Sequence, residues 1–126
     1  MREILFRGKR VDNGEWVYGN LFIPDMKDTP TQICIGTNVI RATYDIDPST
    51  VGQYTGLTDK NGKKIFEGDI VKIKGKTRYV FYGISSFRYT NHGEYAAELQ
   101  DVFTTRYCEV IGNIYDNPEL LRSDAK

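Results

Sequence analysis

Short segments that alternate apolar and polar residues recur along the whole chain, and turn residues separate them. Gly, Pro, Asn and Asp interrupt the sequence about every 8 to 12 residues, which is the spacing of strands in small antiparallel sheets. Nine tyrosines, six phenylalanines and one tryptophan strengthen this pattern, because aromatic side chains favour strands. The sequence therefore predicts a mainly β protein built from antiparallel strands.

The first hairpin is predicted to join Glu3–Arg7, which Gly8 ends, to Glu15–Phe22. Between them, Asn13-Gly14 favours a type I′ turn, because both residue types tolerate positive φ. Successive residues of a strand face opposite sides of the sheet. The second strand is therefore expected to carry Trp16, Tyr18 and Asn20 on one side and Val17 and Leu21 on the other.

A second hairpin is predicted to pair Gln32–Ile35 with Val39–Tyr44. The turn signal Asp47-Pro48-Ser49 follows it. We therefore divide the chain into an N-terminal β-hairpin region, residues 1–50, and a second domain, residues 51–126. One continuous domain over the whole chain is the alternative.

The second half begins with a short strand, a turn at Asn61-Gly62 and a hairpin over Asp69–Tyr82 that turns near Gly75. Asn117 suits a helix N-cap and Pro118 suits the first helical position, so a short C-terminal helix is predicted there. A helix over Tyr95–Gln100 has weaker support. The remaining strands are predicted at Phe87–Thr90, Glu94–Leu99 and Tyr107–Tyr115.

Three blocks of the sequence together resemble the YopX family of phage and prophage proteins. They are FRGK with WVYGNL (Phe6–Lys9 and Trp16–Leu21), TVGQYTGLTDKNGKKIFEGDIV (Thr50–Val71) and EVIGNIYDNPELL (Glu109–Leu121). The resemblance implies a cytoplasmic protein encoded by a phage or prophage. It also implies an SH3-like barrel in the C-terminal part. It carries over neither a biochemical function nor any catalytic residue.

Charge is segregated along a chain that is neutral overall, with seventeen basic and seventeen acidic residues. Residues 60–78 hold seven basic and two acidic residues, whereas residues 91–126 hold seven acidic and three basic ones. Complementary stretches of this kind can pair between subunits, which predicts a homo-oligomer. Lysines interleaved with aromatic residues are also typical of nucleic-acid surfaces. Lysines on a half-exposed hairpin can equally well keep its edges soluble. The candidate binding residues are Lys60, Lys63, Lys64, Lys72, Lys74, Lys76, Arg78 and Tyr79.

The sequence identifies no catalytic residue, metal ligand or cofactor. The lone histidine, His92, lies in a turn-like segment, and the two cysteines, Cys34 and Cys108, are far apart and lie in apolar strand contexts. Such cysteines usually behave as small hydrophobic residues. The acidic residues that could bind Mg²⁺ are Asp45 with Asp47, or Asp59 with Glu67 and Asp69.

The sequence predicts a non-enzymatic binding or regulatory module that can self-associate. The alternative is a small metal-dependent nuclease or hydrolase that uses the Asp and Glu residues as ligands. The charged N-terminus has no apolar core of a signal peptide, and no apolar run approaches the roughly 20 residues that cross a membrane. We therefore expect a cytoplasmic protein without a membrane partner. Protein and nucleic-acid partners both stay open.

Overall fold

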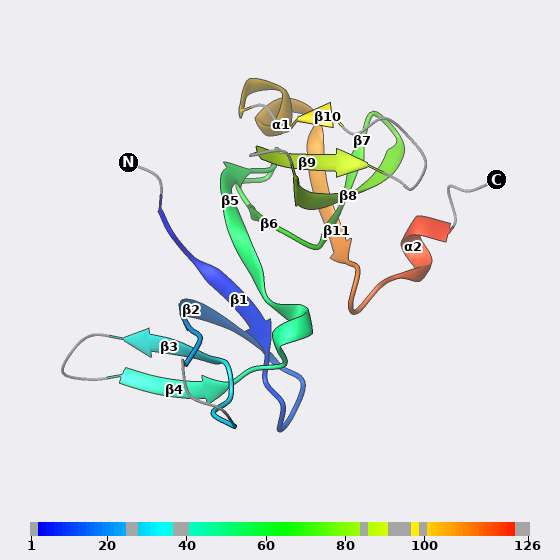
Figure 1. Cartoon of the computed structure of the whole chain (residues 1–126). Coiled ribbons are helices and arrows are strands. Elements are labelled where there is room, and N and C mark those ends of the chain that lie inside the picture. The colour runs from blue at the N-terminus through cyan, green and yellow to red at the C-terminus, as the bar shows by residue number, and fades with distance from the viewer. Residues whose placement is uncertain are drawn as a thin grey trace. The chain divides into compact units, whose positions relative to one another are not determined.

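The computed structural model describes residues 3–24, 28–36, 41–83, 86–90, 97–98 and 101–122 (Figure 1). The chain forms two compact units, unit 1 (Met1–Tyr54) and unit 2 (Thr55–Lys126). Antiparallel strands dominate both units, and the described helices are short. The predicted mainly β class is therefore confirmed.

Unit 1 is an antiparallel sheet in which β4, β3, β2 and β1 follow one another, and the first residues of β5 pair with β1. An isolated bridge between Arg10 and Ile46 ties the end of β1 to the residue after β4. Val17, Ile33 and Ile46 form the core of this unit. Its elements are β1 (Phe6–Lys9), β2 (Trp16–Phe22), β3 (Gln32–Gly36), β4 (Arg41–Asp45), the 3-10 turn η1 (Pro48–Thr50) and β5 (Gly52–Thr58), which runs on into unit 2.

Gly8 lies inside β1, so the prediction that it ends the first strand is wrong. A Cβ atom at this position would overlap Cγ2 of Ile46, and one at Gly19 in β2 would overlap the carbonyl oxygen of Cys34. Glycine in a strand often marks such a close approach rather than a strand end. Both glycines therefore allow the small sheet of unit 1 to pack closely.

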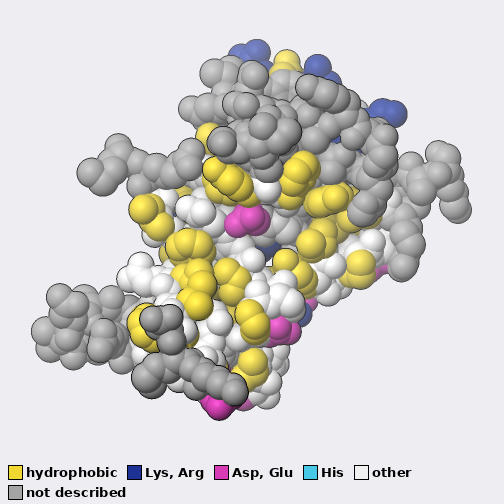
Figure 2. Space-filling view, in the orientation of Figure 1, with side chains coloured by type: hydrophobic (Ala, Val, Ile, Leu, Met, Phe, Trp, Pro, Cys, Tyr) yellow, Lys and Arg dark blue, Asp and Glu magenta, His cyan; other side chains and the backbone are white. Residues whose placement is uncertain are grey.

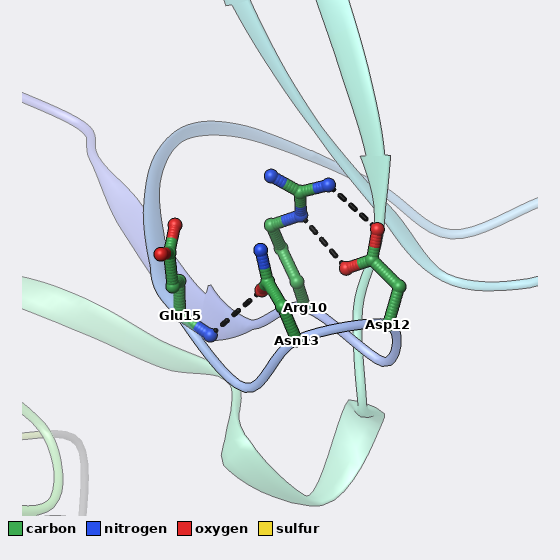
Figure 3. A network of polar contacts seen from close by, with 4 residues as sticks. All are labelled: Arg10, Asp12, Asn13 and Glu15. Carbon is green, nitrogen blue, oxygen red and sulfur yellow. Dashed lines mark hydrogen bonds and ion pairs between the residues drawn. The ribbon is translucent and has the colours of Figure 1, made fainter.

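The turn between β1 and β2 is longer than the predicted type I′ turn (Figure 3). Gly14 has a φ of 74°, but Asn13 has no positive φ, which a type I′ turn requires at both central positions. Instead, Asn13 Oδ1 accepts a hydrogen bond from the N–H of Glu15 at 2.9 Å. Arg10 donates two hydrogen bonds to the carboxylate of Asp12, which lowers the pKa of Asp12.

Unit 2 contains a five-stranded antiparallel sheet with the order β10-β9-β8-β7-β11. Among the described residues, no pairing closes this sheet into the SH3-like barrel that the family resemblance implies. The core comprises Ile65, Val71, Ile73, Val80, Phe87 and Cys108. The elements of this unit are β6 (Lys64–Phe66), β7 (Asp69–Ile73), β8 (Lys76–Gly83), β9 (Ser86–Thr90), β10 (Ala97–Glu98), α1 (Asp101–Tyr107), β11 (Cys108–Asn113) and α2 (Glu119–Arg122).

The predicted hairpin with a turn near Gly75 and the short C-terminal helix are confirmed as β7–β8 and α2. The helix α1 was not predicted, because the sequence favoured strand from Tyr107 onward and placed a weaker helix over residues 95–100. The described part of the chain contains no helix that is long and apolar enough to cross a membrane.

The second and third family blocks meet at Gly68. The N–H of Ile114 donates to the carbonyl oxygen of Gly68 at 2.8 Å, and the N–H of Gly68 donates to Val80 at the same distance. A Cβ atom on Gly68 would lie 3.0 Å from the ring of Tyr115. Next to this contact, Asn113 of β11 lies opposite Asp69 of β7 in the strand register. These contacts give the most distinctive sequence blocks a structural role.

Substituting Gly68 by alanine is expected to lower the free energy of unfolding more than substituting Gly62 does. Both glycines have positive φ, 88° and 82°, which disfavours a side chain by about 1 kcal/mol or more. Only Gly68 also faces the Tyr115 ring, since nothing lies within 4 Å of a Cβ at Gly62. Urea denaturation of both variants measures the difference, and equal losses would contradict the packing role.

Candidate functional site

The carboxylate of Asp59 fixes the turn between β5 and β6 onto β11. Asp59 is 2% exposed. Its Oδ1 accepts hydrogen bonds from the N–H of Asn61 at 2.8 Å and from the N–H of Lys63 at 2.9 Å. Its Oδ2 accepts a hydrogen bond from the N–H of Val110 in β11 at 2.9 Å. The buried side chain of Asp59 therefore places the neighbouring Lys60 beside β11.

Three lysines gather around the start of β11. The N–H of Lys60 donates to the first carbonyl of β11 at 2.9 Å, and its Nζ lies 3.7 Å from Oε1 of Glu109. Lys72 lies directly opposite Glu109 in the β7–β11 register. The Nζ of Lys74 lies 4.8 Å from the ring centre of Tyr107, which is 39% exposed. We name these residues the lysine cluster: Lys60, Lys72, Lys74, Tyr107 and Glu109.

The lysine cluster has an excess of positive charge at the surface. All three lysines are exposed, and three cations against the single carboxylate of Glu109 leave a formal charge of +2. Figure 2 shows several Lys and Arg side chains at the outer edge of unit 2 in this view. The cluster combines exposed cations with an exposed aromatic ring.

Lys63 and Lys64 are also exposed, and they follow the turn that Asp59 holds. The β7–β8 register divides the other candidate residues between two faces. Lys76 and Arg78 lie opposite the core residues Ile73 and Val71, whereas Lys72 points to the other face. The stretch of residues 60–78 therefore does not form one continuous basic surface.

Arg78 and Tyr79 are only half-buried, and both make contacts within their own strand. Arg78 Nη1 donates to the carbonyl oxygen of Thr77 at 2.8 Å. The ring of Tyr79 lies 5.9 Å, centre to centre, from the ring of Phe81. These contacts give the two side chains a packing role in the sheet.

Sequence reasoning missed Tyr107 and Glu109, which complete the lysine cluster. Both lie far along the chain from Lys60 and Lys72. The pairing of β11 with β7 brings Glu109 opposite Lys72, and the Asp59 turn brings Lys60 beside β11. The available signal was the alternation Tyr-Cys-Glu-Val, because Cys and Val mark the buried side of a strand. This alternation alone would have placed Glu109 on the exposed side of the strand.

Four of the five acidic residues weighed as metal ligands, Asp45, Asp47, Asp59 and Asp69, accept hydrogen bonds from the protein. Asp47 Oδ1 caps the 3-10 turn through the N–H and hydroxyl of Ser49, and Asp45 Oδ1 accepts from Gln32. Asp69 Oδ2 accepts from the N–H of Phe66 at 2.7 Å. Within the described ranges, no three His, Cys, Asp or Glu residues are grouped as metal ligands would be. His92 lies outside the described residues.

The two cysteines are free thiols in different environments. Cys108 is fully buried in the core of unit 2, as a small hydrophobic residue would be. Burial, together with the nearby carboxylates of Asp59 and Asp69, raises its pKa to about 12. Cys34 is half-buried, and its Sγ lies 3.5 Å from Oγ1 of Thr43. The interpretation of both cysteines as buried small hydrophobic residues therefore fits Cys108, whereas Cys34 is only half-buried.

Residues 5–122 match the family described as YopX protein. The chain belongs to the YopX family. The match spans all three blocks from which the resemblance was inferred. Those blocks build the β1–β2 hairpin, the Asp59 turn and the contact at Gly68 in this member of the family.

The chain is also similar in structure to protein EF1440 from Enterococcus faecalis, known from a crystal structure. The two share 22% sequence identity with a TM-score of 0.63, over 96% of this chain and 99% of that chain. At this identity the likeness concerns the fold alone. No curated protein matches the sequence.

Replacing Asp59 by asparagine is expected to lower the free energy of unfolding by about 1.5–3 kcal/mol. Asparagine can keep one oxygen for Asn61 and Lys63, but its NH₂ group would then face the N–H of Val110. Urea denaturation measures the loss. The control is Asp12→Asn, an exposed carboxylate in a surface ion pair, for which the midpoint should stay near wild type. Equal midpoints for the two variants would contradict the role of Asp59.

Only Cys34 is expected to react with a thiol reagent in the native protein, because Cys108 is buried and its pKa is about 12. Thiol titration before and after unfolding gives the number of reactive thiols in each state, and Cys34→Ser should abolish labelling of the native protein. Two reactive thiols in the native state would refute this. The raised pKa of Cys108 also makes stability depend on pH: its contribution is fully present below about pH 9 and is lost as the pH rises toward 12.

Proposed function

We propose that the protein is a non-enzymatic binding module that contacts nucleic-acid phosphates through the lysine cluster. The observation that carries this proposal is the convergence of Lys60, Lys72 and Lys74 on residues 107–109, where α1 ends and β11 begins. Flexible ammonium groups act as point charges on phosphates, and each neutralised phosphate releases bound counterions. Three exposed lysines at one place are suited to such contacts.

Tyr107 and Glu109 give the cluster features beyond simple charge. The exposed ring of Tyr107 offers an apolar face beside the ammonium of Lys74, a combination that suits a nucleotide. Glu109 lies near Lys60 and opposite Lys72, so it limits the local charge. Weak binding that depends strongly on salt is therefore expected.

The proposal includes action in the cytoplasm during a phage or prophage life cycle, as the family resemblance implies. Self-association through complementary charge remains a separate prediction. The ion pair between Lys60 and Glu109 already joins the basic and acidic stretches within one chain, which weakens that prediction. Light scattering at low salt tests it, and a monomer at high concentration would exclude a dimer of this kind.

The double variant Lys72→Gln/Lys74→Gln is expected to weaken binding to a short synthetic duplex in a mobility-shift titration. The slope of log affinity against log salt should become shallower by about 0.9 for each phosphate that the variant no longer neutralises. The matched control is Lys63→Gln/Lys64→Gln, which removes the same charge outside the cluster. The control should retain most of the binding.

Equal losses in both double variants would show that net charge rather than the cluster determines binding. Absence of any salt-dependent shift with the wild-type protein would overturn the proposed function. An acidic protein partner would then be the next ligand to test, with the same pair of variants.

A further inference from the structure

The turn between β7 and β8 holds a lysine in a backbone conformation that lysine rarely adopts. Lys74 has a φ of 51° and Gly75 a φ of 80°, and the paired residues Ile73 and Lys76 flank them. Positive φ at both central positions is characteristic of a type I′ turn, which favours Asn and Gly there. Other L residues are disfavoured at such a position, because Cβ comes too close to the following carbonyl oxygen. The turn itself therefore does not account for a lysine at residue 74.

The ammonium group of Lys74 lies against the ring of Tyr107. Cys108 pairs with Ile73 in the strand register, so the residue that precedes β11 lies beside the turn. The Nζ of Lys74 is 4.8 Å from the ring centre of Tyr107, which is within the range of a cation–π contact. Tyr107 is the last residue of α1 and is 39% exposed. The left-handed turn and the junction between α1 and β11 thus bring one ammonium group onto one exposed ring.

The cations around this ring are exposed to solvent. Arg106, in the last turn of α1, directly precedes the tyrosine and is exposed, and Lys72 is exposed on β7. Two carboxylates belong to the same region. Glu109 lies opposite Lys72, and its Oε1 is 3.7 Å from the Nζ of Lys60, whereas Asp59 is buried and accepts three backbone N–H groups. An anionic ligand at the ring therefore meets accessible cations, and the one exposed carboxylate lies beside an ammonium group.

A nucleic-acid base can replace the ammonium group on the ring of Tyr107. An exposed cation–π contact contributes about two- to fivefold to an equilibrium constant. Stacking of one base on an aromatic side chain contributes about fivefold to a hundredfold. The flexible stem of Lys74 then allows its ammonium group to move from the ring to the phosphate of the same nucleotide. In a duplex the bases are stacked inside, so a base reaches a ring only after it is unstacked.

We propose that Lys74 and Tyr107 bind an unpaired nucleotide of a single-stranded nucleic acid. The base stacks on the ring of Tyr107, and its phosphate is bound by the ammonium group of Lys74. Lys72 and Arg106 supply further cations for the neighbouring phosphates. This inference rests on the function proposed above and adds the class of nucleic acid that the lysine cluster prefers. It also gives a reason for a lysine at a turn position that favours Asn or Gly.

The variant Lys74→Asn separates binding from folding. The turn then reads Asn-Gly, which a type I′ turn favours, so the melting temperature should equal or exceed that of wild type. Fluorescence anisotropy with a short labelled oligothymidylate should nevertheless show weaker binding. The slope of log affinity against log salt should become shallower by about 0.7, the value for one phosphate of a single strand. Lys76→Gln is the matched control, because it removes an exposed charge beside the same turn on the opposite face from Lys72.

Tyr107→Ala should weaken binding of the oligothymidylate about tenfold, because it removes the stacking of one base. It should leave binding of the duplex with the complementary strand nearly unchanged. Tyr107→Phe keeps the ring and should bind the single strand as wild type does. Tyr82→Ala is the control for a lost ring, because Tyr82 is 54% exposed elsewhere on unit 2, and it should keep wild-type affinity. Thermal unfolding of each variant shows whether it folds.

The wild-type protein should bind the single strand more tightly than the duplex. Equal affinity for the two would overturn the inference, and so would wild-type affinity for the single strand in Lys74→Asn or Tyr107→Ala. In each of these cases the phosphate contacts of the proposed function would still stand, provided that Lys72→Gln/Lys74→Gln weakens binding of the duplex. Absence of salt-dependent binding to both nucleic acids would instead overturn the proposed function, and the inference with it.

Discussion

The buried carboxylate of Asp59 is the constraint on which the candidate surface of unit 2 depends. Its two oxygens accept three backbone N–H groups, two from its own turn and one from β11. A buried charge is tolerated only when hydrogen bonds satisfy it, and backbone donors satisfy it without any flexible partner. The turn therefore has one position relative to β11, and Lys60 reaches Glu109 because of it.

The sequence was sufficient to predict most strands and turns, because periodicity and turn residues are local signals. It failed where packing decided the outcome. Gly8 looked like a strand end, but the close approach of Ile46 explains a glycine within the strand. The segment Val-Phe-Thr-Thr in α1 favours strand by propensity, yet Thr104 is fully buried in a helix. Tertiary burial can override intrinsic preference in this way.

The candidate site was only partly predictable for a related reason. Lysines close in sequence were expected to form one patch, but strand alternation sends Lys72 and Lys76 to opposite faces. In contrast, Tyr107 and Glu109 are distant from these lysines in sequence, yet Glu109 lies opposite Lys72 in the β7–β11 register and Tyr107 lies beside Lys74. The register between strands depends on residues far apart in the sequence. Counting charges along the sequence therefore cannot show which side chains lie together.

The neutrality of the chain limits what the lysine cluster can contribute by charge alone. A protein with equal numbers of basic and acidic residues has little long-range attraction for phosphates, and three lysines give only a few salt-dependent contacts. Stacking on aromatic rings does not depend on net charge, and it supplies affinity that salt does not screen. A neutral module that binds nucleic acid therefore needs exposed rings as well as cations. Tyr107 is such an exposed ring, and it lies beside Lys74 in unit 2.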